Sequence, residues 1–167
     1  MNAFAPVKSV DSVLSILSKI SMFGGVMDDK QSEVFQLLES GVFKKGEYIF
    51  KKGDEPTHIY IVKSGNVSLQ VTDDGVVIDK KTLGVGESFG EASLLSMCKH
   101  TANAVALEET EIIVLSRRAL IRLQQHDIAL FALLIMNLAR ELARRLKLTD
   151  EILLHYAHTH EDLPKSI

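Results

Sequence analysis

Hydrophobic and polar residues alternate along the middle of the chain, which is the pattern of strands with one buried face. Val67, Leu69 and Val71 alternate with Ser68 and Gln70. Further short apolar runs predict strands at residues 48–50, 59–62, 76–78, 103–107 and 111–115. A turn signal at 73–75 predicts a hairpin, and glycines recur between the other runs. Such spacing predicts a mainly β region, a compact antiparallel barrel or sandwich, over residues 41–116.

Both flanks of this region change to a helical period. Residues 1–40 predict an N-terminal helical segment, in which Gly41 would lie just past the end of the second helix. The apolar positions of this segment are Val13, Leu14, Leu17 and Ile20 in the first helix and Val34, Phe35, Leu37 and Leu38 in the second. Residues 117–160 predict two C-terminal helices, capped by Ser116 and by Asp127, the second ending near His155.

The second of these C-terminal helices carries an apolar seam at intervals of three or four residues. Its candidate dimer residues are Ile128, Phe131, Ile135, Leu138 and Leu142, with Ile152 and Tyr156 beyond a break at Arg145 and Thr149. A helix of this length spans roughly 40 Å, more than a small roll can cover. We therefore expect a homodimer through this helix; the alternative is that the helix packs back on its own roll.

Composition and charge narrow the class of protein. The chain has 167 residues, 46% hydrophobic and 25% charged, which suits one globular domain. A net charge of −3 argues against general affinity for nucleic acid or anionic membrane. No apolar run is long enough to span a membrane, and the N-terminus lacks the pattern of a signal peptide. We expect a cytoplasmic protein.

The glycine-rich stretch at residues 83–95 is the strongest candidate for a binding site. Gly84, Gly86 and Gly90 allow sharp turns and close approach of a ligand, and a short apolar helix is expected to begin near Glu91. Free N–H groups at such a helix start favour an anion such as phosphate. A carboxylate beside an anion site is unusual, but Glu91 could accept hydrogen bonds from a sugar hydroxyl next to the phosphate.

This stretch and two upstream segments, 45–54 and 59–65, together resemble the cyclic nucleotide-binding domain family. That family includes the catabolite activator protein and the regulatory subunits of protein kinase A. The resemblance extends from about Leu14 to Tyr156 and implies an eight-stranded, jelly-roll-like β-roll with N-terminal helices and a long C-terminal helix. It also implies a ligand, cAMP or cGMP, and a phosphate-binding cassette within residues 86–102.

The resemblance assigns roles to residues of the cassette, with one departure. Glu91 takes the position that binds the ribose 2′-hydroxyl. The candidate ligand-binding set is Phe89, Gly90, Glu91, Ala92, Ser93, Lys99, His100, Thr101 and Ala102. The family carries an arginine that pairs with the cyclic phosphate, and counting from Glu91 puts His100 in its place. Thr101 does not discriminate adenine from guanine.

The replacement of arginine by His100 predicts weak or absent nucleotide binding. Histidine lacks a permanent charge and a two-pronged donor, and losing a charge-assisted hydrogen bond costs about 1.5–3 kcal/mol. A pocket kept only as a scaffold predicts that His100 and Glu91 pair with each other or with water. The alternative is a working cAMP or cGMP sensor in which His100 and Lys99 serve the phosphate.

Other candidate sites are weaker. The histidines at 155, 158 and 160 could hold a metal, but a solvated helix end is the simpler interpretation. Cys98 could be a redox-sensitive thiol, although single cysteines usually only pack. Arg140, Arg144 and Arg145 are expected on a solvated face. No His-x-His pair lies among the strands, so we expect no enzyme and no metal. Too few residues follow Tyr156 for a helix-turn-helix, so we expect no DNA binding unaided but an unidentified protein partner.

Overall fold

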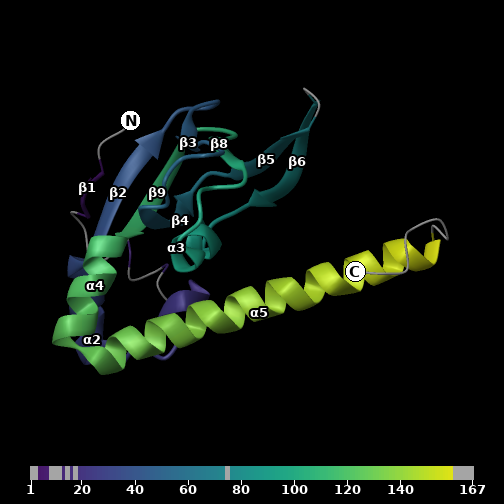
Figure 1. Ribbon diagram of the computed structural model, residues 1–167. Helices are drawn as coiled ribbons and strands as arrows, with labels where there is room; N and C mark the ends of the chain where they lie inside the picture. Colours follow the sequence, from purple (N-terminus) through teal and green to yellow (C-terminus); the bar gives the residue numbers. More distant parts are fainter. Residues whose placement is uncertain (1–3, 8–12, 14–15, 17–18, 74–75, 160–167) are drawn as a thin grey trace.

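The computed structural model describes residues 4–7, 13, 16, 19–73 and 76–159. Nine strands lie in these residues: β1 (Ala5–Pro6), β2 (Leu38–Phe43), β3 (Tyr48–Phe50), β4 (His58–Ser64), β5 (Val67–Asp73), β6 (Val76–Leu83), β7 (Ser88–Phe89), β8 (Asn103–Ala106) and β9 (Thr110–Ser116). The helices are η1 (Ser21–Phe23), α2 (Asp28–Gln36), α3 (Glu91–Ser96), α4 (Arg117–His126) and α5 (Ile128–Thr159). The expected β-rich roll with flanking helices and a long C-terminal helix is confirmed (Figure 1).

Two antiparallel sheets form the roll. Their strand orders are β1-β2-β9-β4-β7 and β3-β8-β5-β6. Strands β2 to β9 make the expected eight, and β1 adds a short edge strand from the N-terminal segment by pairing with β2. The edge strand β6 is exposed along most of its length, whereas β4 and β9, at the centre of their sheet, are mostly buried on both faces.

The N-terminal segment departs from the expectation at two places. The first expected helix falls largely outside the described residues, although Val13 is buried and Ile20 precedes η1. The second helix, α2, ends before Leu37, and Gly41 lies in the middle of strand β2, where it pairs with Ile112. The assignment of Gly41 to a helix end is therefore wrong. Its glycine is explained by the Phe4 ring, since a Cβ there would lie 3.0 Å from Phe4 Cδ1.

The expected helix caps are present at the C-terminal helices. Ser116 Oγ accepts a hydrogen bond from the Ala119 N–H at the start of α4. Asp127 Oδ1 accepts one from the Leu130 N–H at the start of α5. Both caps satisfy N–H groups that a helix start leaves free, which fixes where each helix begins.

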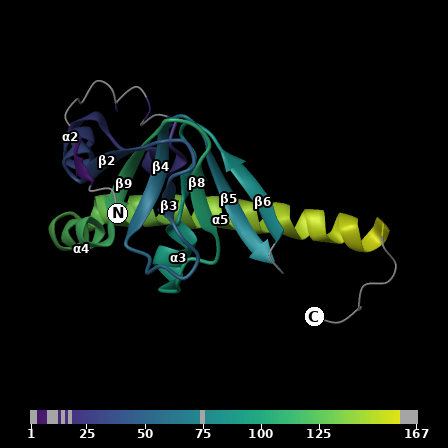
Figure 2. The ribbon, with the colours of Figure 1, turned by 90° about the horizontal axis from the view of Figure 1, so that it is seen from above.

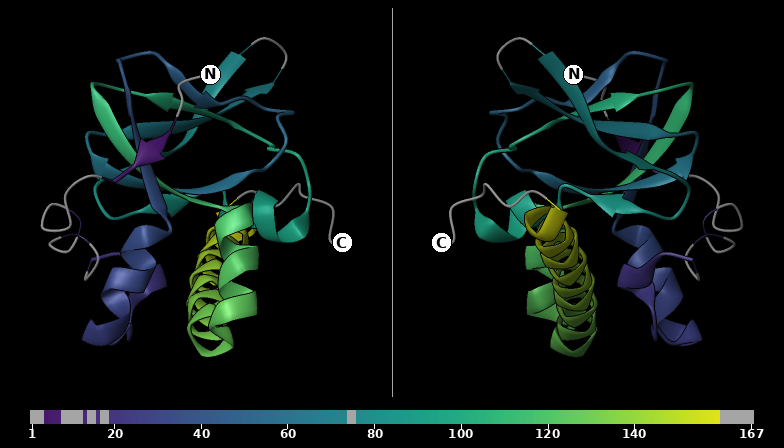
Figure 3. Two further views of the ribbon diagram at one scale, coloured as in Figure 1. Left: turned by 90° about the vertical axis from the view of Figure 1, so that its left-hand side faces the viewer. Right: turned by 90° about the vertical axis from the view of Figure 1, so that its right-hand side faces the viewer.

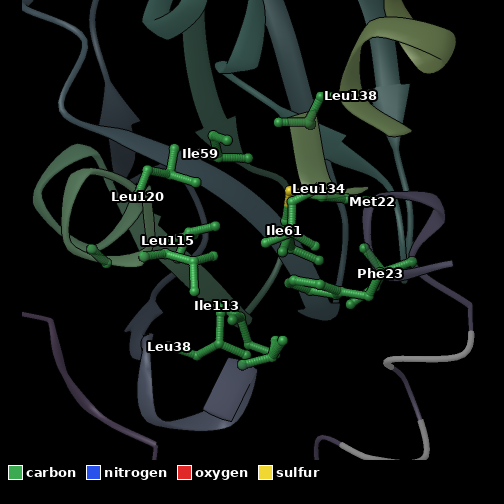
Figure 4. Packing of buried hydrophobic residues seen from close by; sticks show 14 of the residues in the cluster. Met22, Phe23, Leu38, Ile59, Ile61, Ile113, Leu115, Leu120, Leu134 and Leu138 are labelled. Atoms are coloured by element: carbon green, nitrogen blue, oxygen red, sulfur yellow. The ribbon is translucent and has the colours of Figure 1, made fainter. Parts of the chain in front are cut away.

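Two hydrophobic clusters hold the molecule together. One fills the roll between the sheets and includes Phe50, Tyr60 and Phe89. The other lies beneath the roll, where α4, α5 and η1 cover the β2-β9-β4 sheet (Figures 2 and 3). Figure 4 shows Leu134 and Leu138 of α5 packed in this cluster together with residues from the sheet and the N-terminal segment. The first half of α5 is thus part of the core.

Candidate functional site

The cassette begins at a sharp backbone turn. Gly90 follows β7 with φ +81°, in the left-handed region, and α3 starts at the next residue, Glu91. A Cβ at Gly90 would lie 2.8 Å from Tyr60 Cδ2, so a larger residue is excluded by space as well as by conformation. The buried Phe89 ring lies 5.3 Å from the Tyr60 ring and fastens the turn to the interior of the roll.

Glu91 is buried, with 1% of its surface exposed, and its partner is Arg145 from α5. Arg145 Nη1 donates to Glu91 Oε1, and Arg145 Nη2 donates to the Ser88 carbonyl at 2.8 Å. Arg145 Nε donates to Glu141 Oε1 at 3.2 Å. The guanidinium is therefore held by three acceptors, and the long helix closes against the cassette at this point.

His100 is the other buried polar residue of the cassette, with 3% of its surface exposed. Its ring stacks on Phe50, with centroids 3.7 Å apart and planes 9° apart. The backbone N–H of His100 donates to the Asp54 carbonyl, and the backbone carbonyl of His100 accepts from the Gly53 N–H. Burial lowers the pKa of His100 below its ordinary 6.5, although the Asp54 carboxylate opposes this shift. The imidazole is therefore neutral near pH 7.

Of the two pairings expected for His100 and Glu91, with each other or with water, the first is wrong. Glu91 pairs with a cation from another element, and His100 stacks on an aromatic ring. Among the described residues, three buried side-chain polar atoms have no hydrogen-bond partner, and the cassette holds two of them, Glu91 Oε2 and His100 Nε2. Since buried polar groups are nearly always paired, these two atoms mark a place where partners are missing.

The remaining predicted site residues lie around α3 and the loop after it. Lys99 is exposed and its Nζ lies 3.5 Å from Glu55 Oε1, so its charge is directed to the surface. Thr101 is exposed and Ala102 is half-buried just before β8. In α3, Ala92 is exposed, and the carbonyl of the half-buried Ser93 accepts from the Cys98 N–H at 3.2 Å.

The weaker candidate sites gain no support. Cys98 is exposed, and its thiol donates to the Ser96 carbonyl at 3.4 Å. His155 and His158 are exposed near the end of α5, and His160 lies outside the described residues. No group of three potential metal ligands lies together in the part of the chain that the structure describes.

Arg145 is the site residue that sequence reasoning missed. Its placement on a solvated face is wrong, because its guanidinium pairs with the buried Glu91, whereas its interruption of the apolar seam is as expected. Its partner Glu91 is 54 residues away, so no local pattern links the two. The available signal was its position: a single arginine interrupts the apolar seam of a long helix, and this is where α5 passes the cassette.

A β-roll with a cassette at a left-handed glycine and a covering C-terminal helix defines a ligand-binding domain of the cyclic nucleotide type. The family model described as "Cyclic nucleotide-binding domain" matches residues 41–127. The chain belongs to the cyclic nucleotide-binding domain family, as its motifs indicated. The family is named for the cyclic nucleotides that its domains bind, and several relatives are receptors and channels with this ligand in their names.

Individual relatives agree with this assignment. The cyclic AMP receptor protein of Thermus thermophilus is 35% identical over 77% of this chain and 58% of its own length. The crystal structure of the catabolite activator protein of the same organism is 33% identical, with a TM-score of 0.73, covering 82% of this chain and 63% of that one. A cyclic nucleotide-binding domain from Methylobacillus flagellatus has a TM-score of 0.82 at 20% identity, over 100% and 92% of the two chains.

The receptor and channel relatives are longer proteins, and only one part of each is shared. This chain spans 58% of the Thermus receptor and 15% of the canine cyclic nucleotide-gated channel beta-3, which is 32% identical over 71% of this chain. The shared part is the binding domain, so the activities of the whole relatives are not assigned by the match. None of the helices in the described part of the chain combines the length and apolar character that a bilayer span requires.

Proposed function

We propose that this chain is a non-catalytic, homodimeric regulatory module whose cyclic nucleotide site is weakened or lost and which acts through contacts with a protein partner. The observation that carries this proposal is His100. It stands where the family places an arginine, and it is buried, neutral and stacked on Phe50. A cyclic phosphate placed there would meet no permanent charge from this position, so its desolvation would not be offset.

The alternative sensor, with His100 and Lys99 serving the phosphate, has less support. Lys99 faces Glu55 at the surface, and both side chains are mostly exposed. The backbone of His100 is held on both sides by hydrogen bonds to residues 53 and 54. Recruiting either side chain to a phosphate would need the loop to rearrange, or would need a proton on an imidazole whose burial opposes it.

The second half of α5 supports dimerisation. Phe131, Ile135 and Leu138 of the predicted seam pack on the chain's own core. Beyond Leu142, however, the helix carries a row of exposed apolar side chains: Leu146, Leu148, Ile152, Leu153 and Leu154. Several large apolar side chains exposed along one segment are typical of an interface. We infer that the dimer contact lies here, C-terminal to the seam residues first expected.

Arg145 links the site to the proposed interface. It belongs to α5, contacts Glu91 in the cassette, and comes immediately before Leu146, the first residue of the exposed apolar row. Any ligand or partner that changes the Glu91–Arg145 contact would therefore change the position of the proposed dimer helix. Coupling of this kind requires only that the two arrangements of α5 differ in affinity for that ligand.

Calorimetric titration with cAMP and cGMP tests the weakened site. We expect affinities no tighter than about 100 μM for the natural chain, and about ten- to a hundredfold tighter binding for His100→Arg, which restores one charge-assisted hydrogen bond. His100→Gln is the matched neutral control. Micromolar binding of either nucleotide by the natural chain would overturn the proposal in favour of a sensor.

Sedimentation velocity tests the dimer. We expect the natural chain to sediment as a dimer at micromolar concentration and a Leu146→Glu, Leu153→Glu variant to sediment as a monomer. Lys147→Glu changes an exposed residue of the same segment and serves as the control, with the dimer expected to persist. A monomeric natural chain would contradict this part of the proposal.

A further inference from the structure

Two buried atoms without partners describe the chemistry that the cassette lacks. Glu91 Oε2 is a carboxylate oxygen, which can only accept, so the missing partner is a donor such as a hydroxyl group. His100 Nε2 belongs to a ring that burial keeps neutral, so it completes an uncharged hydrogen bond. The Phe50 ring stacks on His100 and lies 5.9 Å from the Phe89 ring, two residues before Glu91, which ties the two ends together.

The cations near the cassette are already paired with carboxylates. The Arg145 guanidinium donates to Glu91, Glu141 and the Ser88 carbonyl. Lys99 lies beside Glu55 at the surface. Arg144 Nη1 donates to Glu141 at 3.1 Å, so each of these cations already has a carboxylate partner. An anionic group entering this site would lose its water without gaining a permanent counter-charge, which is costly.

We propose that the ligand of this site is an uncharged ribonucleoside, taken in preference to a cyclic nucleotide. This inference rests on the proposed function, because it assumes that the cassette is the nucleotide site of the fold. Glu91 Oε2 accepts from a ribose hydroxyl while Arg145 keeps Oε1, so the ion pair is retained. His100 Nε2 makes a neutral hydrogen bond where a phosphate would need a charge. The site therefore favours a ligand that is uncharged where it meets His100 and that carries a hydroxyl donor where it meets Glu91.

Titration calorimetry with adenosine, guanosine, cAMP and cGMP tests the proposal on the natural chain and on His100→Arg. We expect at least one of the two nucleosides to bind the natural chain at least about tenfold more tightly than its cyclic nucleotide. In His100→Arg we expect the preference to reverse. The 2′-deoxy form of the bound nucleoside should lose at least about tenfold in affinity, because Glu91 Oε2 is then left without a donor. This control needs no variant and so does not depend on folding.

The outcomes separate this inference from the proposed function. If neither nucleoside binds the natural chain while His100→Arg gains cyclic nucleotide binding, the nucleoside inference is overturned and the weakened site stands. If the natural chain binds cAMP or cGMP as tightly as the nucleoside, at micromolar affinity, both are overturned. If the 2′-deoxynucleoside binds as well as the ribonucleoside, Glu91 is not the acceptor, and the inference is overturned even though a nucleoside binds.

Discussion

The two halves of α5 are built from similar residues but have opposite surroundings. In the first half, Leu130, Leu134 and Leu138 recur every four residues and are buried against the roll and η1. In the second half, leucines and isoleucines are again frequent, but residues 146–158 are all exposed. Figure 1 shows that α5 extends beyond the other helices and runs beneath the end of the roll that holds β5 and β6. Leucines and isoleucines therefore form part of the core in the first half of α5, and in the second half they are exposed and available to a partner.

Arg145 marks the boundary between these halves. It lies seven residues after Leu138, at the spacing of two helical turns, so it continues the buried stripe. At this point α5 passes the cassette rather than the apolar sheet, and the stripe changes from leucine to a guanidinium paired with Glu91. We infer that the first half fixes the helix to the domain and that Arg145 makes the contact at which the site can influence the second half.

The largest expected effect is a difference in the free energy of unfolding between variants in the two halves of α5. Leu138→Ala should lower the free energy of unfolding by about 2–5 kcal/mol, because it removes buried methyl groups and leaves a cavity. Leu153→Ala, in the exposed half, should change it by less than about 0.5 kcal/mol when measured at concentrations where the chain is monomeric. Urea denaturation followed by circular dichroism measures both. Equal losses would contradict the division of α5 into an anchored and a free half.

Arg145 and its neighbour Arg144 form the next test. Arg145→Ala should cost about 1–3 kcal/mol, because it leaves the buried Glu91 carboxylate without its cation. Arg144→Ala should cost less than about 0.5 kcal/mol, because the Arg144 side chain is 67% exposed and Glu141 keeps its contact with Arg145. The same denaturation experiment applies. A neutral Arg145→Ala would show that Glu91 finds another partner and that the contact does not hold α5 to the cassette.

Sequence reasoning succeeded where structure depends on near neighbours. The caps at Ser116 and Asp127 were predicted because each side chain bonds an N–H three residues away. Strands were predicted because alternation between faces is a property of the strand itself. Gly41 was misassigned because the need for a glycine there comes from the Phe4 ring, which precedes the edge strand β1 and is distant in the sequence. Arg145 was missed for the same kind of reason, since its partner belongs to a distant segment. Likewise, the stacking of His100 on Phe50 depends on how two distant segments meet.

A smaller effect is expected where the first half of α5 meets the N-terminal segment. Asn137 Nδ2 donates to the Met22 carbonyl at 3.0 Å and to the Gly24 carbonyl at 2.7 Å. Asn137→Ala should cost about 1–2 kcal/mol, since two hydrogen bonds of about 1 kcal/mol each are lost. Arg140→Ala removes only a donor to the Asn137 side chain and should cost less. Native-state hydrogen exchange of residues near η1 would show whether the loss is local, as expected, or global.

The smallest effect concerns the cap at the start of α5 and depends on pH. The Leu130 N–H, followed by the Lys30 ammonium 2.6 Å away, holds the pKa of Asp127 below its ordinary 3.8. A lowered carboxyl pKa stabilises the fold above the unfolded value, and this stabilisation is lost as pH falls through the folded value. We therefore expect the natural chain to have a higher melting temperature than Asp127→Asn at neutral pH, with the difference vanishing in acid below pH 3.8.

Lys30 provides the control for this last prediction. In a Lys30→Gln background the ion pair is absent, so Asp127→Asn should lower the melting temperature less than it does in the natural chain. The double-mutant cycle isolates the pair from the capping bond to Leu130, which asparagine can retain through its side-chain oxygen. If the difference between aspartate and asparagine were the same in both backgrounds, Lys30 would not contribute to holding the anchored end of α5. The first half of the helix would then be fixed by its buried leucines and Asn137.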